Sequence, residues 1–202
     1  MAAAAIAVVN APHSATLQAL AATDFFNDEA NVNSVWNGLF NEAFHVVHPG
    51  TLGNSYLLAP EGKAADGKRA LRADILILKL AYAGTPPVFS GIIPVLSFEG
   101  KSGVSTDKYE QIGSQLHDWY TNSGYDKKGY RVFAVGAHGS DCWFFYHDAT
   151  SSDIRNLNLT GGGGAPRKLA TGNKHETYNV AVHYTTILQT LQWFAANPGA
   201  RL

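Results

Sequence analysis

The stretch that decides the fold runs from Arg72 to Lys101 and reads RADILILKLAYAGTPPVFSGIIPVLSFEGK. Two apolar runs rich in Ile, Leu, Val and Phe flank a break that contains Gly84, Pro86 and Pro87. Each run is too short for a long helix, and Gly and Pro favour a turn between them. The pattern therefore predicts two antiparallel strands that form a hairpin.

The few charged residues of this hairpin stand at its open end. Opposed residues in an antiparallel hairpin have a constant sum of positions, so a turn centred on Pro86 and Pro87 places Asp74 opposite Glu99. Side chains alternate between the two faces of a sheet, which puts Glu99, Lys101 and Asp74 on one face. Two carboxylates and a lysine are therefore expected to meet at the end of an apolar hairpin.

Two interpretations of this cluster remain open from the residues alone. Neighbouring carboxylates repel each other unless a positive charge lies between them. Lys101 can supply that charge in a structural ion pair. A divalent cation such as Mg²⁺ or Mn²⁺ can also supply it, because such cations prefer hard oxygen ligands. Lys101 would then orient or help to deprotonate an attacking water.

The remaining elements follow from hydrophobic periodicity. Helices are predicted within residues 28–48 and over residues 107–120 and 178–196, where apolar residues recur at helical spacing. A short strand is predicted around residues 56–58 within a loop-like segment. Two further strands are predicted over residues 130–135 and 142–147, joined by a turn over residues 136–141.

With these elements in place, the chain resembles a known family. Asp74, a long gap, and then Glu99, Gly100 and Lys101 resemble the signature of the PD-(D/E)XK, or restriction-endonuclease-like, nuclease superfamily. The following helix and strands come in the expected order, and the resemblance covers about residues 32–148. It is similar to small nuclease-like domains of fungal proteins. One departure is that Ala73 stands where the family signature has proline.

The resemblance implies an α/β fold with a three-layer α/β/α core, in which helices flank a central mixed sheet. It also implies metal-dependent hydrolysis of phosphodiester bonds in DNA or RNA, with Mg²⁺ or Mn²⁺ as cofactor. In this family Asp74 and Glu99 would hold the metal, the Gly100 carbonyl would be a further ligand, and Lys101 would position the water. A glutamate on the first helix and a glutamine on the helix after the hairpin would complete the site, and the candidates are Glu42, Gln111 and, second, Gln115.

Each of these supporting residues also has a simpler interpretation. Glu42 lies at the border of an apolar stripe and can equally be a solvated carboxylate on the flank of the helix. Glutamine is a good helix former, so Gln111 and Gln115 need no special role. The densest basic cluster precedes Asp74 and is either a phosphate-contacting edge or a solvated loop; it consists of Lys63, Lys68, Arg69 and Arg72.

Composition sets further bounds on the function. The 202 residues are 46% hydrophobic and 15% charged, which suits one globular domain over residues 1–202. A net charge of −1 argues against strong non-specific binding of nucleic acid and favours the rival interpretation, a catalytically inactive nuclease-fold interaction module.

Localisation and partners are also expectations at this point. The single cysteine, Cys142, excludes an internal disulfide framework and fits an intracellular compartment. The N-terminal residues make a poor signal peptide, and no apolar run is long enough to span a membrane. The expected partner is therefore a nucleic acid substrate and not a membrane. The sequence leaves the oligomeric state open, with a homodimer as one option.

Overall fold

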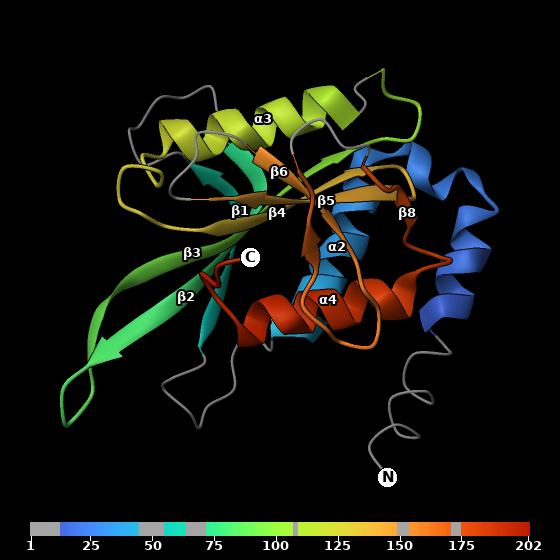
Figure 1. Cartoon of the computed structure of the whole chain (residues 1–202). Helices are drawn as coiled ribbons and strands as arrows, with labels where there is room; N and C mark the ends of the chain where they lie inside the picture. Colours follow the sequence, from blue (N-terminus) through green and yellow to red (C-terminus); the bar gives the residue numbers. More distant parts are fainter. Residues whose placement is uncertain (1–12, 45–54, 64–71, 107–108, 149–153, 171–174) are drawn as a thin grey trace, which may run out of the picture.

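A central mixed sheet of eight strands, flanked by helices, forms the framework of the chain (Figure 1). The computed structural model describes residues 13–44, 55–63, 72–106, 109–148, 154–170 and 175–202. The expected α/β class with a central mixed sheet is confirmed. Among the described residues, no helix combines the length and apolarity needed to cross a bilayer.

The strands lie in the sheet in the order in which they occur along the chain, β1 to β7, and β8 pairs with β5. All neighbours pair antiparallel except β3 and β4, which are parallel. A parallel pair needs a crossover, and helix α3 supplies it. The strands are β1 Tyr56–Lys63, β2 Arg72–Ala83, β3 Val88–Lys101, β4 Val132–His138, β5 Asp141–His147, β6 Ile154–Asn158, β7 Arg167–Lys168 and β8 Tyr178–Asn179.

Helices cover both faces of this sheet. Helices α2 (Glu29–Phe44) and α4 (Tyr184–Ala196) lie on one face, and α3 (Tyr109–Asn122) lies on the other (Figure 1). Residues 13–21 are also helical, and the short 3-10 helix η1 (Asp24–Asn27) leads into α2. The largest core lies on the α2 and α4 side and is rich in aromatic rings, among them Trp36, Phe40, Phe98, Phe144 and Phe194.

The predicted helices are present, with changed boundaries. The helix predicted over residues 178–196 begins only at Tyr184, and its apolar positions are buried, namely Tyr184, Ile187, Leu188, Leu191 and Phe194. Residues Tyr178–Asn179 instead form β8, which was not predicted. The turn predicted over residues 136–141 is shorter and consists of Gly139 and Ser140, with Gly139 at a φ of 60°.

Gly136 therefore lies inside β4 and not in a turn. A Cβ at this position would lie 2.3 Å from the Ile112 Cγ2 atom of α3. Glycine is required here because the crossover helix packs directly against the backbone of the strand. This close approach brings α3 next to Glu99, the residue of β3 that pairs with Gly136.

The β2–β3 hairpin has the register predicted at its open end but not at its turn. Ile75 pairs with Phe98, and continuing this register places Asp74 opposite Glu99. At the tip, however, Ala83 pairs with Val88, so the turn is centred one residue before the predicted centre. Two register shifts, between Ile77/Leu78 and between Ala81/Tyr82, make up the difference. Such bulges bend a strand pair and increase its twist.

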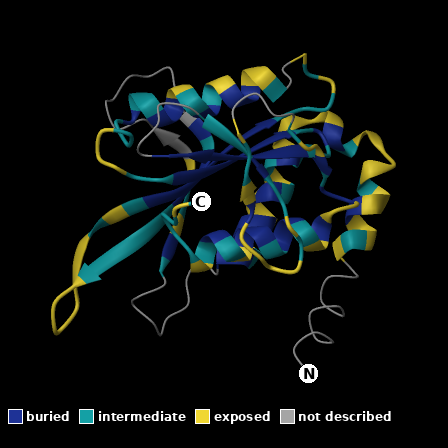
Figure 2. Cartoon of the chain, viewed as in Figure 1, coloured by how far each residue is buried: buried dark blue, intermediate teal, exposed yellow. Residues whose placement is uncertain are grey.

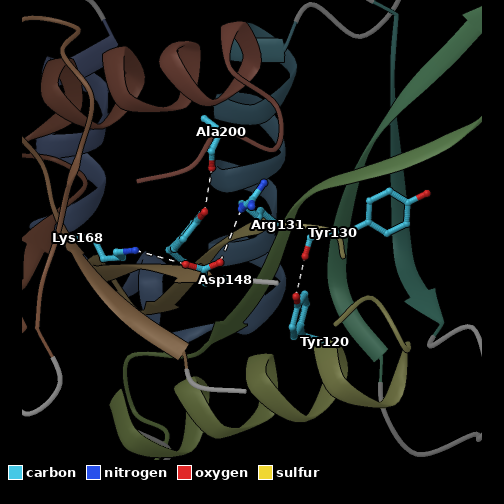
Figure 3. Close-up of polar contacts among 7 residues, drawn as sticks. Tyr120, Tyr130, Arg131, Asp148, Lys168 and Ala200 are labelled. Carbon is cyan, nitrogen blue, oxygen red and sulfur yellow. Dashed lines mark hydrogen bonds and ion pairs between the residues drawn. The ribbon is translucent and has the colours of Figure 1, made fainter. Parts of the chain in front are cut away.

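A polar cluster around Asp148 lies directly after the C-terminal end of β5 (Figure 3). The Asp148 carboxylate lies 3.7 Å from the Arg131 Nε atom and 3.4 Å from the Lys168 Nζ atom. The Tyr146 hydroxyl donates to the Ala200 carbonyl at 2.9 Å. Asp148 thus has cations on both sides, and the cluster joins the sheet to the C-terminal residues; we regard it as structural.

Candidate active site

The open end of the β2–β3 hairpin carries the buried carboxylate of Glu99. Its neighbours on β3 face the α2 layer, since the Phe98 ring packs against Trp36 and Phe40. Because side chains alternate along a strand, Glu99 faces the α3 layer together with Lys101. Only 6% of the Glu99 surface is exposed. A carboxylate so far removed from water requires compensation from its surroundings.

Lys101 supplies the nearest compensating charge. Its Nζ atom lies 2.8 Å from the Glu99 Oε1 atom, and the lysine side chain is itself largely buried. A second carboxylate, that of Glu29, lies 4.0 Å from the same Nζ atom. Burial alone would lower the pKa of Lys101, but the hydrogen bond to Glu99 and the charges of Glu99, Glu29 and Asp74 outweigh it and raise the pKa. Lys101 is therefore a cation at neutral pH.

Asp74 is held to the same strand by its side chain. The Gly100 backbone N–H donates to the Asp74 Oδ2 atom at 2.8 Å, so the carboxylate accepts a bond from β3 just beyond the last paired residues of the ladder. The Asp74 charge is close enough to act on its neighbour. Burial, then the charge of Asp74 and finally that of Glu29 raise the pKa of Glu99 to about 7, and Lys101 only partly opposes them.

Helix α2 approaches this cluster at its N-terminal end. A Cβ on Gly100 would lie 2.2 Å from the Asn33 Oδ1 atom, so the glycine permits a close contact between β3 and α2. The Asn33 Oδ1 atom is buried and has no hydrogen-bond partner among the described residues. Glu29 lies one helical turn before Asn33. Helix α2 thus brings an amide oxygen and a carboxylate to the hairpin end.

The structure does not bring Glu42 to this cluster. Glu42 lies near the other end of the 16-residue helix α2, about 20 Å from Glu29 along the axis at ~1.5 Å per residue. Its carboxylate accepts a hydrogen bond of 2.9 Å from the Tyr184 hydroxyl of α4. The sequence showed correctly that Glu42 borders the buried stripe, but a periodic pattern does not tell which end of a helix meets the site.

The two candidate glutamines of α3 differ in their surroundings. Gln111 is exposed, whereas the Gln115 Oε1 atom is buried without a hydrogen-bond partner in the described part of the chain. Gln115 lies between Ile112, which covers Gly136, and Trp119, which packs with Ala73. These two contacts flank Glu99 and Asp74 along the sheet. Gln115, the second choice from the sequence, is therefore better placed than Gln111.

The predicted basic residues are described only in part. The backbones of Lys63 and Arg72 pair with each other at the same sheet end as Asp74. Their side chains, and Lys68 and Arg69 altogether, lie outside the described residues. The predicted phosphate-contacting edge therefore stays a prediction.

Sequence reasoning missed three polar residues at the site: Glu29, Asn33 and Ser97. The Ser97 hydroxyl is buried on the same face of β3 as Glu99 and has no hydrogen-bond partner among the residues described. The only signal in the sequence was Gly100, because a glycine inside a strand can mark the close approach of another element. That signal does not say which element approaches.

The donors fit a hard divalent cation in their chemistry. The carboxylates of Asp74, Glu99 and Glu29 all offer oxygen, which Mg²⁺ and Mn²⁺ prefer. The Asn33 amide meets Gly100 from the α2 face, on the side of β3 opposite to Glu99. Within the described residues, no group of three or more His, Cys, Asp or Glu side chains is already arranged to hold a metal ion. The Gly100 N–H is engaged with Asp74, and its carbonyl stays a predicted ligand.

Comparisons with known proteins do not identify a family for this chain. No protein-family model, curated protein or solved structure matches the chain.

Proposed function

We propose that the chain is a metal-dependent nuclease of restriction-endonuclease-like fold that hydrolyses phosphodiester bonds of DNA or RNA. The observation that carries this proposal is the buried Glu99 carboxylate, beside Asp74 and against Lys101, at the end of a hairpin. These are the three residues of the PD-(D/E)XK signature. The order hairpin, crossover helix and parallel strand also supports the resemblance.

The residues have distinct roles in this proposal. Asp74 and Glu99 would hold Mg²⁺ or Mn²⁺, and Glu29 would take the role for which the resemblance made Glu42 the candidate. A bound cation would supply Lewis acidity and lower the pKa of a coordinated water. Lys101 suits electrostatic stabilisation of the attacked phosphate better than proton abstraction, because its raised pKa keeps it charged. Gln115 would orient the water or the scissile phosphate.

A second candidate function is an interaction module that keeps this fold without catalysis. The Lys101–Glu99 ion pair of 2.8 Å favours it, because the protein already places one cation on the buried carboxylate. The net charge of −1 favours it as well, since nucleic acid binders are usually basic. The two functions differ in whether the carboxylates need a metal.

A cleavage assay separates them. Labelled single- and double-stranded DNA and RNA would be incubated with the protein in Mg²⁺, in Mn²⁺ and in EDTA. We expect metal-dependent cleavage that falls by ~100-fold or more in Glu99→Gln and Lys101→Met, the usual scale for loss of an electrostatic catalytic group. Glu42→Gln is the matched control on the same protein, and it should keep its activity because Glu42 lies at the far end of α2.

Two results would contradict the nuclease proposal. If the wild-type protein cleaves none of the four substrates in either metal, only the interaction module remains as a candidate function. Cleavage that survives unchanged in both Glu99→Gln and Lys101→Met would show that the activity comes from elsewhere. If Glu42→Gln were the inactive variant, the site would lie beside Tyr184 and not at the hairpin end.

A further inference from the structure

The tip of the β2–β3 hairpin extends beyond the rest of the sheet as a two-stranded arm (Figure 1). The ladder between β1 and β2 ends where Tyr56 pairs with Lys79, and one further bond joins the Leu80 N–H to the Ser55 carbonyl. On the other side, the ladder between β3 and β4 begins only at Leu96. Among the described residues, the outer edge of β3 before Leu96 therefore has no strand beside it.

The composition of this arm is unusual for an exposed element. No charged residue occurs between Lys79 and Glu99. The tip is exposed (Figure 2), and the Phe89 ring meets the Tyr82 ring edge-on at a centroid distance of 6.2 Å. Half of the exposed large hydrophobic side chains in the described part of the chain belong to the arm; the full set is Leu57, Val88, Phe89, Ile92, Val104 and Val182.

An open, apolar strand edge without charge is a template for pairing with another strand, and proteins normally protect such edges with lysine, proline or a covering element. Here Pro94 is the first residue of that kind along β3, and it lies at the base of the arm. Within the described part of the chain, residues 88–93 thus present an outer strand edge without a partner strand, together with apolar side chains. Burying both at once requires a partner strand.

We propose that two copies of this chain associate by antiparallel pairing of residues 88–93 of β3. A two-fold axis at Ser90 would place Val88 of one copy opposite Ile92 of the other, with Phe89 opposite Gly91. The first pair joins two apolar side chains across the strands, and the second places an aromatic ring over a glycine. The same edge is used by both copies, so the association closes at two.

The arm fits a second copy better than nucleic acid. Binding to phosphates depends on Lys and Arg, and the arm has neither beyond Lys79. A chain of net charge −1 offers little repulsion to its own copy. Glu99 lies nine residues from Ser90, ~30 Å along an extended strand. The pairing would therefore leave the carboxylate cluster of each copy open, and it holds whether or not that cluster is catalytic.

Sedimentation velocity tests the pairing on the full chain, from ~1 to ~100 µM, the range in which weak specific complexes dissociate. We expect the wild type to change from the 21.7 kDa monomer to a species of twice that mass. Ile92→Lys and Ile92→Glu should each raise the dissociation constant by about ten-fold or more, because each introduced charge would lie against Val88 of the other copy and lose water without gaining a partner. Val182→Lys is the matched control, because it also replaces an exposed β-branched residue by lysine but lies outside the arm, and it should dimerise as the wild type does. Thermal melts would show that each variant is folded.

The proposal fails if the wild type stays monomeric at the highest concentration. It also fails if Val182→Lys weakens association as much as Ile92→Lys does, or if the mass continues to grow beyond two copies. If the arm instead contacts nucleic acid, the protein alone is monomeric and Ile92→Glu weakens nucleic acid binding, which likewise overturns the pairing.

Discussion

Replacing Glu99 by Gln tests whether the buried carboxylate is held against its electrostatic preference. The folded protein raises the pKa of Glu99 from 4.5 to about 7, so the fold favours the protonated form. The contribution of this group to stability is therefore fully present below pH 4.5 and is lost as the pH rises through 7. A shift of this size corresponds to about 3 kcal/mol at pH 8, at ~1.4 kcal/mol for each pH unit.

Glutamine has nearly the same shape as glutamate and does not titrate. At pH 8 in EDTA, Glu99→Gln should be more stable than the wild type by up to ~3 kcal/mol, which is ~6–12 °C in Tm for a domain of this size. At pH 4.5 the two proteins should differ by less than ~1 kcal/mol, because Glu99 is then protonated in the folded protein and about half protonated in the unfolded chain. Differential scanning fluorimetry at several pH values measures the difference directly, with Glu42→Gln as a glutamate-to-glutamine control away from the cluster.

The same melts in the presence of Mn²⁺ test whether the carboxylates bind a metal. If Asp74 and Glu99 hold a metal, millimolar Mn²⁺ at pH 8 should raise the Tm of the wild type more than that of Glu99→Gln, because a ligand stabilises the state that binds it. The reasoning is refuted if Glu99→Gln melts below the wild type at pH 8 in EDTA. Lys101 and Glu99 would then form a net stabilising ion pair, and the carboxylate would have no need of a cation.

The hairpin shows both the strength and the weakness of prediction from sequence. The two apolar runs around the Gly-Pro break correctly predicted the strands, and the ion pair between Glu99 and Lys101 agrees with the prediction that they share a face. The position of the turn was wrong by one residue, and two register shifts restored the predicted pairing of Ile75 with Phe98. Bulges depend on the twist of the finished sheet and have no reliable signal in the residues of one strand. The correct register near Asp74 thus rested on an incorrect turn.

The parts of the site that were missed come from elements distant in sequence. Helical periodicity identified the buried face of α2, but only packing against β3 decides that Glu29 and not Glu42 lies near Lys101. The same holds for α3, where the Oε1 atom of Gln115 is buried and Gln111 is exposed. Which turn of a helix lies over which strand depends on crossing geometry, and a single sequence does not contain that information in a local pattern.

Two further predictions concern the packing of two glycines and the titration of a buried histidine. Gly100→Ala should cost about 1–3 kcal/mol in chemical denaturation, because its Cβ would lie 2.2 Å from the Asn33 Oδ1 atom. Gly38→Ala, with nothing within 4 Å of its Cβ, should instead stabilise α2 by ~0.5–1 kcal/mol, and equal effects at the two glycines would contradict the packing. His147 is buried against Tyr120 at a ring distance of 4.2 Å, and burial, followed by the charge of His117, lowers its pKa to about 3. Protonation of His147 therefore favours the unfolded chain. The stability that the neutral ring contributes is present above pH 6.5 and falls by ~2 kcal/mol at pH 5. His147→Phe removes the titrating ring and should lose correspondingly less stability between pH 7 and pH 5, and parallel losses in both proteins would show that His147 is not the group that titrates.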